Sequence, residues 1–164
     1  MNLQKDLKEF IALLDSARVK YVIVGGYAVA FHGHPRYTGD IDVFVEVSEQ
    51  NASELEQALK KFGFQSPDLA ADAFRKPDTI VQLGLPPDRI DLITSIAGVR
   101  FDEAWEARIT TVIDGVQMHF LGKPLLLRNK KAVGRPKDRS ETEALTSDEP
   151  RIHDRRRNPR RLPA

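Results

Sequence analysis

The sequence predicts a mixed α/β domain of the α+β class, built from amphipathic helices and short strands that pair as hairpins. Apolar residues recur at helical spacing over residues 2–16 and again after Ser48, which predicts two amphipathic helices. Short β-branched runs separated by turn-forming residues predict strands elsewhere. The length of 164 residues suits one compact domain.

The predicted elements follow one another with few long connections. The predicted strands are 21–24, 41–46, 79–83, 89–94, 109–113 and 116–121. The predicted helices are 2–16, 27–32, 49–62, 101–108 and 124–132, with 139–145 resuming the last helix after a break at 134–138. Residues 63–78 contain Gly and two Pro, so we expect a loop there.

Two turn sequences predict how four of these strands pair. Residues 84–88, Gly-Leu-Pro-Pro-Asp, lie between the third and fourth strands, and Asp114-Gly115 lies between the last two. Asp-Gly is a strong signal for a type I′ turn, whose twist matches that of an antiparallel hairpin. Both pairs are therefore expected to be antiparallel.

Composition narrows the class of protein. The sequence contains no Cys, which excludes disulfides, thiolate zinc sites and Cys nucleophiles. The polar N-terminus and the lack of a long apolar run predict a cytoplasmic protein without a membrane segment. The net charge of +1 hides six Arg and one Asp in residues 151–164, so residues 1–150 are mildly acidic. We expect residues 1–145 to form the domain and residues 146–164 to be a disordered, Arg-rich tail.

The chemically informative segment couples Gly25-Gly26 with Asp40 and Asp42. Residues i and i+2 of a strand point to the same face, so the two aspartates can bind a shared cation cluster. Unpaired buried charge is costly, which is a reason to expect a cation beside them. Hard carboxylate oxygens favour Mg²⁺ or Mn²⁺. Two such ions can stabilise the attacking and leaving oxygens of phosphoryl or nucleotidyl transfer.

Asp91 is the candidate for a third carboxylate, because it interrupts an otherwise apolar strand. The glycines have a separate function, since without Cβ atoms they allow backbone N–H groups to approach phosphate oxygens closely. A plainer interpretation stands beside each of these. Gly-Gly is often only a turn, and Asp91 is alternatively an exposed strand carboxylate.

These residues resemble the motif of the DNA-polymerase-β-like nucleotidyltransferase superfamily. Its pattern is an apolar strand, Gly-Gly or Gly-Ser, then Asp-x-Asp, and a later single Asp on a neighbouring strand. The segment from Gly134 to Asp138, after a helix that contains Lys130, is similar to the ending of abortive-infection nucleotidyltransferases. Those proteins are toxins of type IV toxin–antitoxin pairs. The resemblance extends over residues 5–145.

The resemblance implies a nucleotidyltransferase fold, with a mixed, mainly antiparallel sheet and helices packed against it. It also implies transfer of a nucleoside monophosphate from an NTP to an acceptor hydroxyl, with release of pyrophosphate. Asp40 and Asp42 would bind both metal ions, and Asp91 would bind the catalytic ion and help to activate the acceptor. Arg36 and Lys130 would contact phosphates. The alternatives are a salt bridge for Arg36 and a solvated basic helix face for Lys130.

The motif leaves the acceptor open among RNA such as a tRNA end, a protein hydroxyl and a small molecule. No second domain that would bind an acceptor is visible in the sequence, so an antitoxin or a second copy of the chain is a possible partner. The alternative function is a non-catalytic module of the same fold that binds nucleotide or RNA.

Overall fold

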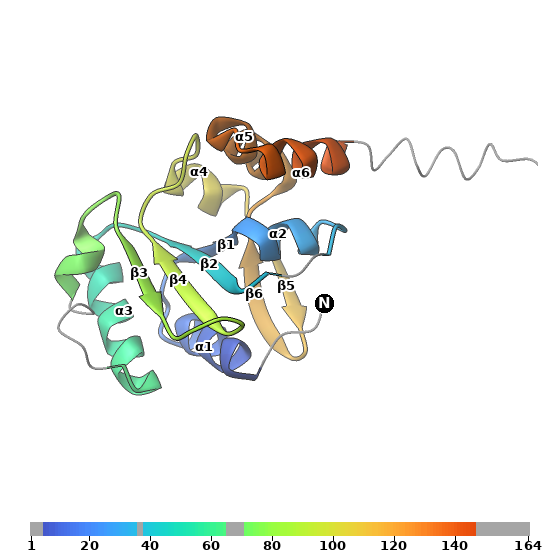
Figure 1. The fold of residues 1–164 in the computed structure, drawn as a ribbon. Coiled ribbons are helices and arrows are strands. Elements are labelled where there is room, and N and C mark those ends of the chain that lie inside the picture. Colours follow the sequence, from blue (N-terminus) through green and yellow to red (C-terminus); the bar gives the residue numbers. More distant parts are fainter. Residues whose placement is uncertain (1–4, 36–37, 65–70, 147–164) are drawn as a thin grey trace, which may run out of the picture.

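The computed structural model describes residues 5–35, 38–64 and 71–146, which form a six-stranded sheet with helices packed against it (Figure 1). The strands are β1 (Tyr21–Val24), β2 (Asp40–Val45), β3 (Ile80–Leu83), β4 (Arg89–Ile93), β5 (Ile109–Ile113) and β6 (Val116–Phe120). The helices are α1 (Lys5–Ser16), α2 (Gly25–Phe31), α3 (Glu49–Phe62), α4 (Phe101–Glu106), α5 (Lys123–Val133), α6 (Pro136–Thr146) and the 3₁₀ helix η2 (Ala71–Arg75). The predicted mixed α/β class is confirmed.

The sheet is mixed and mainly antiparallel, in the order β3-β4-β2-β1-β6-β5. The pairs β1–β2, β3–β4 and β5–β6 are antiparallel, whereas β2–β4 and β1–β6 are parallel. Both predicted hairpins are present. Asp114 and Gly115 have φ angles of 51° and 82°, and a type I′ turn requires positive φ at both central residues. The parallel β2–β4 pair places side by side the two strands that carry the predicted aspartates.

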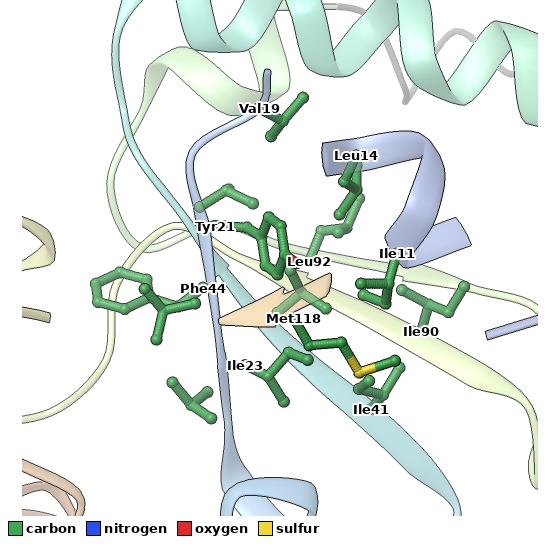
Figure 2. Packing of buried hydrophobic residues seen from close by; sticks show 14 of the residues in the cluster. Ile11, Leu14, Val19, Tyr21, Ile23, Ile41, Phe44, Ile90, Leu92 and Met118 are labelled. Atoms are coloured by element: carbon green, nitrogen blue, oxygen red, sulfur yellow. The ribbon is translucent and has the colours of Figure 1, made fainter. Parts of the chain in front are cut away.

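The hydrophobic core joins α1 to the central strands. Ile11 and Leu14 of α1 belong to the same buried cluster as Tyr21 and Ile23 of β1 and Met118 of β6 (Figure 2). All five side chains are fully buried. Burial of an aliphatic side chain of this size stabilises a fold by about 1.5–3 kcal/mol. This core fixes β1 and, through it, the neighbouring strand β2.

Local signals fix the ends of α3 as predicted. The hydroxyl of Ser48 accepts a hydrogen bond from the backbone N–H of Asn51 at 3.1 Å, which is the bond that an N-cap residue provides. Gly63 follows the helix at φ 107°, a conformation in which glycine commonly ends a helix. The chain then leaves α3 in a defined direction.

Besides shifts of one or two residues at the ends of other elements, three differences from the sequence prediction change the architecture. The helix α2 begins at Gly25 instead of residue 27, so the Gly-Gly pair forms the first turn of a helix. The 3₁₀ helix η2 lies within the predicted loop 63–78. The last helix begins at Pro136, because Gly134 ends α5 at φ 73° and proline suits the first turn of a helix.

The predicted tail lies outside the described residues beyond Thr146, where α6 ends. Among the helices that the structure describes, none combines the length and apolar composition that a membrane span requires.

Candidate metal and nucleotide site

Asp40, Asp42 and Asp91 come together where β2 and β4 pair. The parallel register sets Asp42 opposite Asp91 and Asp40 opposite Arg89. Each aspartate offers one carboxylate oxygen, and these three oxygens lie within 4.8 Å of one another. The fold therefore gathers the three carboxylates that the sequence motif singles out.

Gly25 makes room for one of these carboxylates. Its φ angle is 68°, in the left-handed region that side chains rarely adopt. A Cβ atom at this position would collide with Oδ2 of Asp42. From the sequence, the expected reason for a glycine here is the close approach of a phosphate to the backbone. Space for the Asp42 carboxylate is a second reason, which is visible only in the fold.

A cavity of about 480 Å³ lies over the three carboxylates. Gly25 and Gly26 line it from the first turn of α2. Three basic residues of the C-terminal segment also line it: Lys130 of α5, Lys137 of α6, and Arg135 in the connection between these helices. One cavity thus combines a cluster of carboxylates with backbone that lacks side chains and with several positive charges.

Lys130 is almost completely buried. The residue is 3% exposed, and its Nζ lies 3.3 Å from Asp138 Oδ1 and 3.2 Å from Glu141 Oε1. These ion pairs join α5 to α6. The alternative that Lys130 belongs to a solvated basic face is therefore wrong, and the exposed lysine on this helix is its neighbour Lys131.

The three carboxylates differ in their affinity for protons. Burial raises the pKa of Asp42 to about 7, and repulsion from Asp40 and Asp91 acts in the same direction. Burial also raises the pKa of Asp91, although a hydrogen bond from Arg89 opposes it. Burial acts upward on the pKa of Asp40 as well, but hydrogen bonds with Asp91 and Arg89 outweigh it and lower the pKa. An added cation would favour the charged form of all three groups.

Arg89 is a site residue that the motif does not include. Its Nε donates to Asp91 Oδ1 at 2.9 Å, and its Nη2 donates to Asp91 Oδ2 at 3.0 Å and to Asp40 Oδ2 at 2.9 Å. The contact between Arg89 and Asp91 could have been predicted from the sequence, because these are residues i and i+2 of one strand and share a face. The contact with Asp40 depends on the β2–β4 register, which the sequence alone does not specify.

The ligand set fits a hard divalent cation. All three candidate ligand groups are carboxylates from paired strands, and oxygen ligands of this kind suit Mg²⁺ or Mn²⁺. Thr38 lines the cavity and donates its hydroxyl to the carbonyl oxygen of Asp40 at 2.9 Å, which holds the chain at the start of β2. Arg36 lies outside the described residues, so its phosphate contact stays a prediction.

The chain matches a family model over residues 1–146, and the family, DUF6036, is described as a nucleotidyltransferase of unknown function. The chain therefore belongs to this nucleotidyltransferase family. A search of curated proteins finds no match.

Two solved structures are similar to this fold. One is a candidate nucleotidyltransferase from Thermotoga maritima, with a TM-score of 0.55 and 18% identity over 87% of this chain and 91% of that chain. Another is an antigenic nucleotidyltransferase-like protein from Paracoccidioides brasiliensis, with a TM-score of 0.51 and 20% identity over 88% of this chain and 75% of that one. At such low identity the likeness shows the fold alone. It confirms the nucleotidyltransferase fold that the motif implies.

Proposed function

We propose that the protein is a metal-dependent nucleotidyltransferase that moves a nucleoside monophosphate from an NTP to an acceptor hydroxyl. The observation that carries the proposal is the convergence of Asp40, Asp42 and Asp91 within 4.8 Å, in one cavity with Gly25-Gly26 and three basic residues. Carboxylates alone would favour a bare cation. Carboxylates beside positive charge and open backbone favour a cation that carries a triphosphate.

Asp40, Asp42 and Asp91 are the proposed ligands of Mg²⁺ or Mn²⁺. When bound, such ions would polarise the reacting phosphate and offset the charge of the leaving pyrophosphate. The chain supplies the fixed positions of these ligands, because β2 and β4 pair along residues 40–44 and 89–93. Ligands on paired strands need little reorganisation when the substrate arrives.

The triphosphate is proposed to lie against α2 and the C-terminal helices. Gly25 and Gly26 leave the backbone at the first turn of α2 open to phosphate oxygens. Lys137 is exposed beside the cavity and can approach a phosphate directly. Lys130 adds positive potential from its buried position, where Asp138 and Glu141 hold its ammonium group in place.

In the proposed reaction the acceptor oxygen attacks the α-phosphorus of the NTP. The bond from that phosphorus to the oxygen that bridges to the β-phosphate breaks, and pyrophosphate leaves with the bonding electrons. The acceptor proton passes to a carboxylate of the cluster, and Asp91 is the proposed acceptor of this proton. Most of the catalysis then comes from positioning and charge neutralisation.

The test is release of pyrophosphate from each NTP with Mg²⁺ and candidate acceptors of the RNA, protein and small-alcohol classes. Asp42→Asn keeps the shape of the site and removes one charge, so we expect release to fall by about two to three orders of magnitude, as when one active-site electrostatic group is lost. Asp102→Asn is the matched control, since Asp102 is exposed and paired with Arg100 on α4. Full activity of Asp42→Asn would contradict the proposal.

Calorimetry separates this function from a non-catalytic module of the same fold. Nucleotide binding to the proposed enzyme depends on Mg²⁺ and weakens in Asp40→Asn. ATP or RNA binding that needs neither would favour the module.

The likeness of Gly134–Asp138 to abortive-infection nucleotidyltransferases supports a finer proposal, that the protein is a toxin controlled by an antitoxin. Growth arrest on expression, relieved by Asp42→Asn, would support it. Harmless expression of a protein that is active in the pyrophosphate assay would count against it.

A further inference from the structure

We propose that Arg89 and the divalent metal exclude each other at the carboxylate cluster, so that metal binding releases the guanidinium from Asp40 and Asp91. The inference rests on the proposed function in one respect, that these carboxylates bind a metal. It assigns a role to a residue outside the aspartate motif: Arg89 is the resident counter-ion of the metal-free protein.

Arg89 occupies the oxygens that a metal needs. Its three hydrogen bonds, at 2.9–3.0 Å, engage both carboxylate oxygens of Asp91 and one oxygen of Asp40. Mg²⁺ binds carboxylate oxygens at about 2.0–2.1 Å and demands a nearly ideal octahedral arrangement. A metal ion on the same oxygens would therefore lie beside the guanidinium nitrogens.

The guanidinium of Arg89 and a divalent metal ion are both positively charged, and the carboxylate cluster is largely shielded from water. Asp91 is 5% exposed and the Arg89 side chain is 29% exposed, so water screens their repulsion incompletely. A divalent ion also offers the carboxylates twice the charge of the guanidinium. The metal is thus the stronger partner, and Arg89 yields to it.

Arg89 explains how the metal-free cluster is tolerated. Three carboxylates within 4.8 Å repel one another, and a buried carboxylate without a partner is strongly destabilising. The guanidinium satisfies Asp91 and Asp40, while the Asp42 carboxylate lies against Gly25. Asp42 is thereby left as the ligand that an incoming cation meets without displacing a hydrogen bond from Arg89.

Release of Arg89 needs only the rotation of one long side chain. Arg89 is the first residue of β4 and follows the exposed turn at residues 84–87. Its partially exposed side chain can turn toward solvent while the paired backbones of β2 and β4 stay in register. The exchange therefore requires no movement of the backbone that carries the ligands.

The direct test follows the Nε–H group of Arg89 by ¹H–¹⁵N NMR while Mg²⁺ is added to the wild-type protein. The signal is assigned by its absence in Arg89→Met, which keeps most of the side-chain length and removes the charge. We expect the signal to leave its ion-paired position with the same midpoint as metal binding. An unchanged signal at saturating Mg²⁺ would overturn the exchange.

Metal affinity gives a second readout that needs no enzymatic activity. We expect Arg89→Met to bind Mn²⁺, measured by electron paramagnetic resonance, roughly fivefold or more tightly than wild type, because a unit positive charge close to the ion is removed. Arg89→Lys keeps the charge without the planar fork and should lie between the two. This second variant also serves if Arg89→Met does not fold.

Arg100→Met is the matched control for this measurement. Arg100, the N-cap residue of α4, pairs with Asp102 at the same i, i+2 spacing, at 3.0 Å, but both of these side chains are exposed. It should bind Mn²⁺ like wild type. Equal or weaker binding by Arg89→Met overturns the exchange alone, provided that Asp42→Asn still lowers Mn²⁺ affinity. Mn²⁺ affinity that is indifferent to Asp42→Asn would overturn the proposed metal site as well.

Discussion

Two ionic clusters contribute to the same cavity, and they differ in their balance of charge. The sheet cluster consists of Asp40, Asp42, Asp91 and Arg89, and the helix cluster consists of Lys130, Arg135, Asp138 and Glu141. The sheet cluster has three carboxylates for one cation, whereas the helix cluster has two of each. A balanced cluster is complete in itself and joins α5 to α6. The sheet cluster has more negative than positive groups, so it is expected to attract a further cation. This excess of carboxylates is what we expect of a ligand site, whereas a structural ion pair is balanced.

The pKa values of the carboxylates differ between the two clusters in the direction that this charge balance predicts. In the helix cluster, burial alone would raise the pKa of Asp138, but a hydrogen bond from Arg135 and the charge of Lys130 outweigh it and lower the pKa. In the sheet cluster, burial and two like charges together raise the pKa of Asp42 to about 7. Burial is common to both sites, so the surrounding charges decide which carboxylate stays ionised.

Breaking the helix cluster should have the largest effect on folding. Lys130→Met leaves Asp138 and Glu141 buried without their lysine, and removal of one partner from a buried ion pair costs about 3–5 kcal/mol. Denaturation with urea measures this loss. Lys131→Met is the control on the same helix, and as an exposed substitution it should change the free energy of unfolding by less than about 0.5 kcal/mol. Similar stability of both variants would show that the helix cluster is not structural.

Closing the space beside the sheet cluster should have the next largest effect. Gly25→Ala places a Cβ against the Asp42 carboxylate at a positive φ, so strain and overpacking together should cost roughly 2–4 kcal/mol. Gly115→Ala is the control, because Gly115 has a φ of 82° and nothing within 4 Å of an added Cβ. Conformational strain alone should cost that variant about 1–2 kcal/mol. Equal losses in the two variants would refute the role of Gly25 as space for Asp42.

Features of the molecule with a local cause could be predicted from the sequence. The hairpin at Asp114-Gly115 follows from turn chemistry, and the start of α3 follows from the cap at Ser48. The same-face placement of Asp40 and Asp42 follows from the period of a strand. Each of these depends on residues close together in the chain, so the sequence specifies it without knowledge of the fold.

Features that depend on contacts between distant elements could not be predicted. Lys130 stands beside Lys131 in the sequence, and only the packing of α6 on α5 distinguishes the buried lysine from the exposed one. Arg89 reaches Asp40 across the β2–β4 register, 49 residues away in the chain. The unpredicted part of the site is therefore its charge pairing, whereas the candidate metal ligands belong to a motif.

The pH dependence of stability sharpens the comparison further. The pKa of Asp42 is about 7 in the fold and about 3.9 in an unfolded chain, so the folded state holds a proton that the unfolded state releases. The stability that this proton contributes is complete below pH 4 and is lost as the pH rises through 7. Metal-free wild type should therefore lose roughly 1–3 kcal/mol relative to Asp42→Asn between pH 5 and 8.

Urea denaturation of both proteins at each pH, with a chelator present, measures this difference. Saturating Mg²⁺ should abolish or reverse the loss, because the metal stabilises the deprotonated form of Asp42. The difference between wild type and Asp138→Asn in the helix cluster should instead stay constant from pH 5 to 8, since the lowered pKa of Asp138 contributes stability above the unfolded pKa of about 3.9 and this stability is lost only in acid. A stability difference between wild type and Asp42→Asn that is constant from pH 5 to 8 would mean that Asp42 is an ordinary ionised carboxylate. The contrast in charge balance would then not govern the protonation of the site.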